Sequence, residues 1–341
     1  MCIRDRPRSS VIIGVAIVII VLIAGIWYYY STLTAPTKLG EPVNIKFATN
    51  NVGTSWYLFG GAASEIFEKY LPAGSKVDVL PYAAGVANPI LVHNKSADIG
   101  LAFTLTVKLA YEGLPPYTTK MDDLRLIAAP IDTYWFGFAA TSYSDVESFE
   151  DIINPKHPIK IGTSVLGGLA EYEFRLCLEK YGLTYDDLKA KGVSIMYASM
   201  PTLIKEAQAK RLDVIIWVVN PGHPSWSELF INPGMRFIDL PDDLIEYLKT
   251  KYGLKPSVLK EGFFPGSNEA KSVEFNTIII ARSDMPNELA YTLAKALSES
   301  KEELAAAYPA CSKVWDPSKW KENAVIPYHT GAEKYYKEQY G

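Results

Sequence analysis

The chain has few of the residues that build metal sites, disulfide frameworks and nucleophilic active sites. Its 341 residues include three Cys and four His. The cysteines form no CxxC or other metal-like spacing, and successive histidines are more than 60 residues apart. A disulfide between Cys177 and Cys311 stays open, but the apolar helical pattern around Cys177 favours two buried thiols. The sequence therefore predicts no metal and no cofactor.

Net positive charge is also missing. The formal net charge is -4, and Met1–Ser10 carries three Arg against one Asp, which leaves the rest of the chain at -6. An acidic chain lacks the basic surface that nucleic acid requires. The sequence therefore excludes nucleic acid as a partner.

Common enzyme motifs are absent as well. The loop Gly162–Gly168 follows a predicted strand but lacks the Lys-Ser/Thr pair of a phosphate-binding loop. Ser164 within it has no GxSxG elbow, because Leu166 occupies the second glycine position. Paired carboxylates at 186–187 and 242–243 follow helix-start signals, where acidic groups stabilise the helix dipole. We therefore predict that the protein is not an enzyme and has no catalytic residues.

One long apolar run is present near the N-terminus. Val11–Tyr30 holds 20 residues without a charge, and a helix of that length spans a bilayer core of ~30 Å. Three arginines precede the run, which places residues 1–10 in the cytoplasm and the rest of the chain outside. We expect an uncleaved single-pass anchor at 11–30, with a cleaved signal and a periplasmic protein as the alternative. Residues 1–6 (MCIRDR) back-translate to a sequence similar to a library-preparation adaptor, so they are a candidate sequencing artefact.

Beyond a Pro- and Gly-containing linker at 31–42, apolar strand-like runs alternate with helical patterns. This alternation predicts a mostly parallel sheet with helices on its faces. The predicted strands are VNIKFAT, KVDVLPY and DIGLAF in the first part of the chain, and IKIG, VSIMYA and DVIIWVV in the second.

The first and second parts of the chain show the same order of predicted strands and helices, which indicates an internal repeat. The third strand of each part is entered through a basic residue followed three positions later by Asp, in Lys95-Ser-Ala-Asp98 and Lys210-Arg-Leu-Asp213. We therefore predict two similarly wound lobes, with the loose match of any two α/β domains as the alternative.

Two segments are predicted to connect the lobes. Leu124–Thr141 is too long for one strand and is broken by Pro130, and Ser272–Arg282 is a second extended run that returns the chain. Two crossings make a hinge, and ligands of such proteins bind at the carboxyl ends of the strands. The predicted boundaries are lobe 1 at 43–135, lobe 2 at 136–271, and a return strand with C-terminal helices of lobe 1 at 272–341.

Polar and aromatic residues at predicted strand ends are the candidate ligand contacts. The loop Asn50–Tyr57 leads into a helix whose first N–H groups, with the Ser55 hydroxyl, suit a carboxylate. A simple turn with Ser55 as N-cap and core aromatics is the alternative. Arg175 is a candidate cation if its helix lies close. The candidates are Ser55, Trp56, Tyr57, Thr104, Tyr134, Ser164, Trp217 and Asn220.

Several motifs resemble one transporter family. Gly53–Gly61 (GTSWYLFGG) is similar to the GGTYYPLGG segment of the TAXI subfamily, the solute receptors of tripartite ATP-independent periplasmic (TRAP) transporters. Ala84–Asn88 is similar to the family's GSVEN, and Ile326–Tyr336 (IPYHTGAEKYY) to its IPLHPGAERYY. The resemblance covers about 43–341.

The resemblance implies a periplasmic-binding-protein-like fold of type II that traps a small organic anion, often glutamate or a related dicarboxylate. It implies ligand-facing roles for Ser55, Tyr57 and Asn88. Departures from the family, GTSVLGGL at 162–169 and Phe103-Thr-Leu105, indicate a larger or less polar carboxylate.

We therefore expect an extracytoplasmic solute-binding subunit that closes its lobes on a carboxylate and delivers it to TRAP membrane permease subunits. A solute-binding protein of an ABC importer is the alternative, and a sensory ectodomain is a third class.

Overall fold

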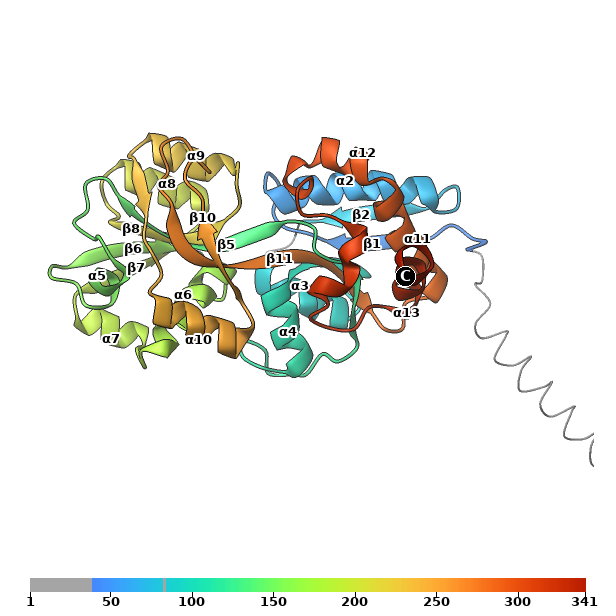
Figure 1. Ribbon diagram of the computed structural model, residues 1–341, viewed down its shortest axis with the longest axis horizontal. Coiled ribbons are helices and arrows are strands. Elements are labelled where there is room, and N and C mark those ends of the chain that lie inside the picture. The colour runs from blue at the N-terminus through green and yellow to red at the C-terminus, as the bar shows by residue number, and fades with distance from the viewer. Residues whose placement is uncertain (1–38, 82–83) are drawn as a thin grey trace, which may run out of the picture. The chain divides into compact units, whose positions relative to one another are not determined.

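The computed structural model describes residues 39–81 and 84–341 as an α/β fold (Figure 1). The expected segments at 1–10 and 11–30, and most of the linker at 31–42, lie outside the described residues. Within 39–81 and 84–341, no helix is both long enough and apolar enough to cross a membrane.

The first part of the sheet, called half A here, contains four short strands with helices between them. β1 lies between β2 and β3 and pairs in parallel with both. Burial alternates along β1, where Ile45 and Phe47 are buried and Lys46 is exposed, because successive side chains point to opposite faces. The elements are β1 (Asn44–Ala48), α2 (Ser55–Tyr70), β2 (Lys76–Leu80), α3 (Ala84–His93), β3 (Ile99–Phe103), α4 (Thr104–Glu112) and β4 (Leu124–Ala128).

The second part, called half B here, repeats this winding. β6 lies between β7 and β8 and pairs in parallel with both. The elements are β5 (Thr133–Thr141), α5 (Phe149–Ile153), β6 (Ile159–Thr163), α6 (Leu169–Lys180), α7 (Tyr185–Ala190), β7 (Val193–Tyr197), α8 (Met200–Gln208), β8 (Val214–Val219), α9 (Pro224–Ile231), β9 (Met235–Phe237), α10 (Asp242–Tyr252) and β10 (Lys255–Leu259).

The predicted repeat is confirmed in detail. In half A the Asp98 carboxylate accepts a hydrogen bond of 2.8 Å from the backbone N–H of Lys46 on β1. In half B the Asp213 carboxylate accepts the equivalent bond of 2.7 Å from Lys160 on β6. The basic residues that open both motifs, Lys95 and Lys210, both have positive φ, at 62° and 57°. The shared sequence pattern therefore encodes one tight turn that positions the third strand beside the first.

Two long strands connect the halves, as the sequence predicted. β5 and β11 (Ala270–Arg282) run side by side between the two groups of helices (Figure 1). β11 pairs antiparallel with β3 and β4 at one end and with β10 at the other. The sheet order is β2-β1-β3-β11-β5-β8-β6-β7, so one curled sheet passes through both halves.

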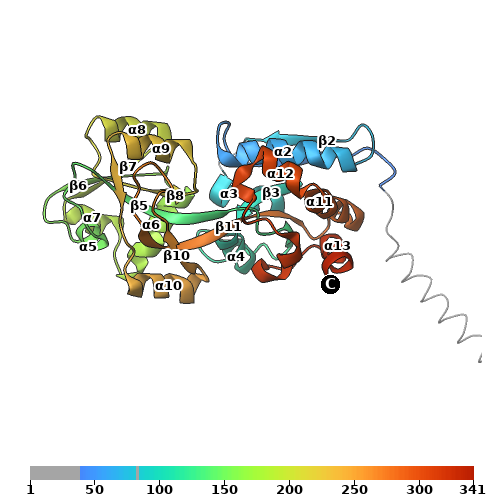
Figure 2. The ribbon, with the colours of Figure 1, turned by 45° about the horizontal axis from the view of Figure 1, so that its top comes forward.

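The C-terminal segment packs on half A. Figure 2 shows α11 beside α13, and the α13 segment reaches β4, where Leu126 bridges to Tyr328. The elements after β11 are α11 (Asn287–Glu299), α12 (Lys301–Ala307), the 3-10 helices η1 (Pro309–Cys311) and η2 (Pro317–Asn323), and α13 (Thr330–Tyr340).

Aromatic side chains fill both cores. Half A buries Phe47 against Phe67, while half B stacks Phe230 on Phe264 at 5.6 Å. A fully buried aromatic side chain contributes about 2–3 kcal/mol. Cys177 and Cys311 are free and buried, as the helical pattern favoured.

Candidate functional site at the carboxyl ends of the strands

The predicted site residues lie where strands end and helices begin. Ser55 opens α2, in the first turn after the β1 loop, and Thr104 opens α4 directly after β3. Ser164 follows β6, and Asn220 follows β8. This is the edge where a doubly wound sheet carries its ligands.

Aromatic residues form the base of this edge in half A. The Trp56 ring lies 4.4 Å from Phe103, and Tyr134 meets Phe103 edge-on at 5.1 Å. The Trp56 indole N–H donates a hydrogen bond of 3.0 Å to the Thr277 hydroxyl on β11. Trp56 and Tyr134 are 3% and 5% exposed, so they pack against the crossing strands more than they face solvent.

Polar side chains tie the strand ends to the crossing strands. The Thr104 hydroxyl accepts a hydrogen bond of 3.1 Å from the backbone N–H of Asn276 on β11. From half B, the Asn220 amide donates 2.9 Å to the backbone oxygen of Thr133 on β5. The Asn276 amide in turn donates 3.0 Å to the Thr133 hydroxyl. Residues predicted separately in each half therefore meet on one short stretch of β5 and β11.

Asn88 is fully buried and serves the backbone. Its amide nitrogen donates to the backbone oxygens of Ala48 and Thr49, at the end of β1, and of Leu101, in the middle of β3. Its amide oxygen has no protein partner. The Thr163 hydroxyl at the end of β6 is likewise buried without a partner. The structure therefore uses the Asn88 side chain to join β1 and β3 and does not expose it, so the ligand-facing role that the resemblance implied for Asn88 stays a prediction.

Ser164 organises the loop before α6. Its hydroxyl accepts a hydrogen bond of 3.0 Å from the backbone N–H of Glu171, while the Glu171 carboxylate accepts 2.9 Å from Gly167 N–H. The loop is therefore held at both ends by side chains of the same turn. Its tip, Val165 and Leu166, is 55% and 70% exposed.

Arg175 lies beside this loop, as the sequence left open. Its guanidinium forms two hydrogen bonds with Glu171, of 2.7 and 3.1 Å, and covers the Tyr172 ring at 5.1 Å. The Tyr172 hydroxyl donates a hydrogen bond to the backbone oxygen of Pro115 in half A. Arg175 is therefore a partly exposed cation next to a contact between the halves.

The remaining candidates have fewer contacts. Tyr57 is partly exposed in the first turn of α2, and Trp217 is partly buried against the core of half B. The alternative that made Ser55 the N-cap is wrong, because the cap is Thr54, whose hydroxyl accepts from Tyr57 N–H. Thr54 takes the capping position one residue earlier, which leaves the Ser55 hydroxyl for other partners.

Sequence reasoning missed an acidic residue. Asp132, between β4 and β5, is 1% exposed and accepts a hydrogen bond of 2.6 Å from the Tyr308 hydroxyl. Burial raises the pKa of this carboxyl to about 6, although Thr277 and Tyr308 lower it. The run APID carries no signal for such a contact, because Tyr308 is 176 residues away.

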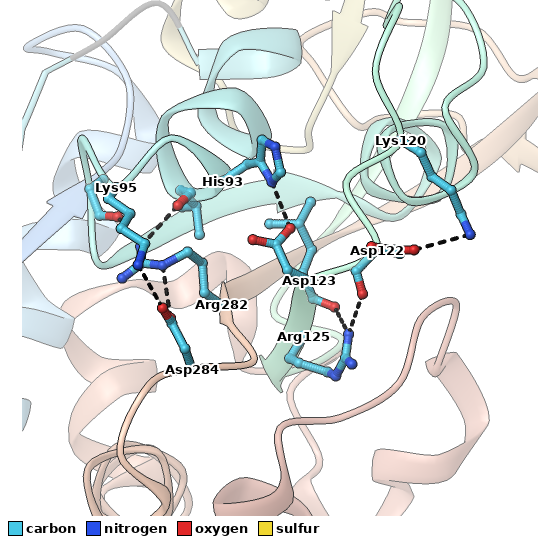
Figure 3. Close-up of polar contacts among 11 residues, drawn as sticks. His93, Lys95, Lys120, Asp122, Asp123, Arg125, Arg282 and Asp284 are labelled. Carbon is cyan, nitrogen blue, oxygen red and sulfur yellow. Dashed lines mark hydrogen bonds and ion pairs between the residues drawn. The ribbon is translucent and has the colours of Figure 1, made fainter.

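The other edge of the sheet carries a cavity of about 300 Å³, beside the amino ends of β1 and β3. Arg282 lies there, bonded to Asp284 and to the backbone oxygens of Val92 and Ala97 (Figure 3). Lys95 pairs with Asp284 at 2.9 Å. These groups satisfy one another, and the cavity is remote from the predicted residues, so we assign it no ligand. In the described part of the chain, no group of His, Cys, Asp and Glu could hold a metal ion.

Two strand-helix repeats on one curled sheet, with crossing strands between them and polar groups at the strand ends, define an α/β periplasmic-binding-protein-like fold. The chain belongs to the NMT1-like family, whose model matches residues 47–339.

Several solved structures are similar to this chain at low sequence identity. A TctC solute binding protein from Polaromonas is 11% identical with a TM-score of 0.50, and the match covers 89% of this chain and 98% of that chain. XAC2383 from Xanthomonas citri, bound to chloride ion, is 9% identical with a TM-score of 0.50, covering 86% and 99%. The alkanesulfonate-binding protein SsuA from Xanthomonas axonopodis pv. citri, bound to MOPS, is 13% identical with a TM-score of 0.44, covering 87% and 84%.

Proposed function

We propose that this chain is the extracytoplasmic solute-binding subunit of a TRAP-type secondary transporter of the TAXI kind, binding a small organic acid between half A and half B. The observation that carries the proposal is the convergence of Trp56, Thr104, Tyr134 and Asn220 on the crossing strands, in a chain with this fold. A solute that touches these residues contacts both halves and their hinge at once.

An anionic ligand suits this edge of the sheet, because the two longest helices that follow its strand ends have their N-termini here. α2 and α6 begin there, and the N-terminus of a helix attracts negative charge. Arg175 lies beside the same loop, and its ion-pair partner Glu171 holds the guanidinium donors in a fixed orientation. Exposed Val165 and Leu166 at the loop tip favour a ligand with apolar carbon next to its carboxylate.

Transport needs binding and release, and a hinge supplies both. We propose that lobe 1 (43–135 with 272–341) and lobe 2 (136–271) rotate about β5 and β11. The solute favours the closed arrangement by its extra contacts there. An anchor at 11–30 would hold this receptor beside its permease.

The test is ligand identification with the purified full chain in detergent. Native mass spectrometry of the protein as isolated, followed by thermal-shift screening of dicarboxylates, amino acids and apolar carboxylates, should find one acid class. A ligand at a hundred times its dissociation constant stabilises the folded state by about 2.7 kcal/mol. Stabilisation by sugars or cations instead of acids would overturn the carboxylate proposal, and no binding by any class would overturn the receptor proposal.

Variants then locate the site. Ser55→Ala, Tyr57→Ala and Asn220→Ala should each weaken binding of the identified acid by about five- to tenfold, as for one lost hydrogen bond or contact. Thr250→Ala on exposed α10 is the matched control and should bind normally. Copurification with a fused membrane permease supports the TRAP assignment, whereas copurification with an ATPase favours the ABC alternative.

A further inference from the structure

Asp132 occupies the point where the two crossing segments meet. Its backbone oxygen accepts hydrogen bonds from the Thr277 N–H at 3.1 Å and from the Asn276 amide at 3.2 Å. Its neighbour Ile131 donates 2.8 Å to the Thr277 backbone oxygen. The backbone of Asp132 is therefore fixed between β11 and the start of β5, the two strands that connect the halves.

Burial raises the pKa of this carboxyl and outweighs Thr277 and Tyr308, which lower it. One oxygen, Oδ2, accepts the Tyr308 hydroxyl at 2.6 Å, and the other, Oδ1, is buried without a hydrogen-bond partner. The titratable groups that face it are Tyr134 on β5, Tyr308 after α12 and Cys311 on η1. Burial raises the pKa of all three above the ordinary values, so they are neutral at pH 7 and supply no positive charge.

Hydrogen bonds connect Asp132 with the proposed ligand site. The Trp56 indole N–H donates to the Thr277 hydroxyl, and the Thr277 backbone N–H donates to the Asp132 backbone oxygen. Trp56 follows Ser55, a candidate ligand contact, in the first turn of α2. The start of α2 is thus two hydrogen bonds from the residue that carries the buried acid. A charge bound near Ser55 acts on Asp132 through a medium with few polar groups to screen it.

We propose that Asp132 is a proton-binding residue of the ligand site, so that an organic anion bound near Ser55 drives uptake of one proton by the Asp132 carboxyl. This rests on the proposed function, since it assumes an anionic ligand at the strand ends. The proton comes from the solvent and binds Oδ1, while Oδ2 keeps its Tyr308 hydrogen bond. By linkage, ionised Asp132 weakens anion binding, and the affinity falls as the pH rises.

The size of the effect follows from Coulomb's law. For a separation on the order of 10 Å and an effective dielectric constant of about 20, an anion changes the protonation equilibrium of a carboxyl about tenfold. The affinity for the acid should therefore fall about tenfold between pH 5 and pH 8, and binding near pH 7 should take up a fraction of a proton.

The experiment is calorimetry with the full chain, using succinate and L-glutamate, and then the acid identified above, as probes. Titrations in two buffers of different ionisation enthalpy give the number of protons taken up. Asp132→Asn keeps the shape and the acceptor for Tyr308, and it should bind with an affinity that does not depend on pH and without proton uptake. Asp122→Asn, an exposed residue near β4, is the matched control and should behave as the wild type.

A second measurement does not depend on the ligand. The infrared C=O band of a protonated carboxylic acid should grow as the pH of the wild-type protein is lowered through about 6, and this part of the band should be missing from Asp132→Asn. Equal proton uptake in wild type and Asp132→Asn, or equal infrared titrations, would overturn the inference. Acid binding that is the same at all pH values would overturn it too while leaving the proposed function intact, whereas the absence of acid binding overturns the proposed function first.

Discussion

The hydroxyl of Tyr172 on α6 donates a hydrogen bond to the backbone oxygen of Pro115, and so joins half B to half A away from the crossing strands. Close by, Leu169 lies against Gly85, where an added Cβ would be 3.0 Å from the Leu169 Cβ. The first turn of α6 therefore provides contacts between half B and half A.

Tyr172→Phe should loosen this contact and keep the ring that the Arg175 guanidinium covers. One hydrogen bond contributes about 1 kcal/mol, so the bound acid should dissociate about fivefold faster. Stopped-flow tryptophan fluorescence measures the rate. Tyr291→Phe, which removes a hydroxyl bonded to Glu338 within the C-terminal segment, is the control, and equal rates in the two variants would count against a role for the Tyr172 contact.

Arg175→Ala should destabilise the chain through the partner that it leaves behind. Glu171 is fully buried and keeps only the Gly167 N–H and the Tyr185 hydroxyl when the guanidinium is removed. The loss should be about 2 kcal/mol, below that of a fully buried pair because Arg175 is 43% exposed. The double variant Glu171→Gln/Arg175→Ala should recover about half of it, measured by urea unfolding. Additive single losses would show that the two side chains are not coupled.

Glu173 predicts a pH dependence of stability. It is fully buried on α6, neither carboxyl oxygen has a partner, and burial raises its pKa well above the ordinary value. The folded state then keeps a proton that the unfolded state has lost, so stability is full below the ordinary glutamate pKa and falls as the pH rises toward the native one. Glu173→Gln should raise the melting temperature at pH 7 and flatten this slope.

The control for Glu173 is on the same helix. Burial acts to raise the pKa of Glu179, but Lys251 and Tyr252 lower it more, so its contribution has the opposite sign and is lost as the pH falls. Glu179→Gln should therefore lower the melting temperature at pH 7 or leave it unchanged. A matching rise in both variants would indicate a general charge effect and not the burial of Glu173.

Gly331→Ala should disrupt the packing of α13 on α11. An added Cβ would lie 1.8 Å from the backbone oxygen of Asn287, too close for any neighbour to yield without moving a helix. We expect a loss of about 3 kcal/mol in the free energy of unfolding. Gly61→Ala, in α2 with nothing within 4 Å, is the control and should gain up to about 1 kcal/mol from helix propensity. Denaturant unfolding of both variants provides the comparison.

The architecture was predictable where local patterns repeat. The Lys95–Asp98 and Lys210–Asp213 motifs each specify a turn and a contact with a backbone N–H about 50 residues earlier. Because the two motifs are similar, they correctly predicted a similar placement of the third strand in each half. β10 was missed, because KPSVL at 255–259 is short, contains Pro and lacks an apolar run. It forms a strand because β11 offers it a paired edge.

The site was predictable only in outline. Residues after strands could be named from the sequence, because strand ends share one edge of a parallel sheet. Their hydrogen-bond partners could not be predicted. The amide nitrogen of Asn88, for example, donates to three backbone oxygens. The carboxyl of Asp132 depends on a tyrosine from the far end of the chain. Both are tertiary contacts without a local signal.

The position of β11 also sets the order in which the chain can assemble. Phe103 on β3 pairs with Thr277 on β11. The ribosome synthesises β11 only after all of half B, so one edge of β3 stays unpaired until then, although all residues of β3 are buried in the folded protein. Such an edge is prone to pair with other chains. We expect nascent chains truncated before residue 270 to need a chaperone, whereas release of the full chain should remove that need.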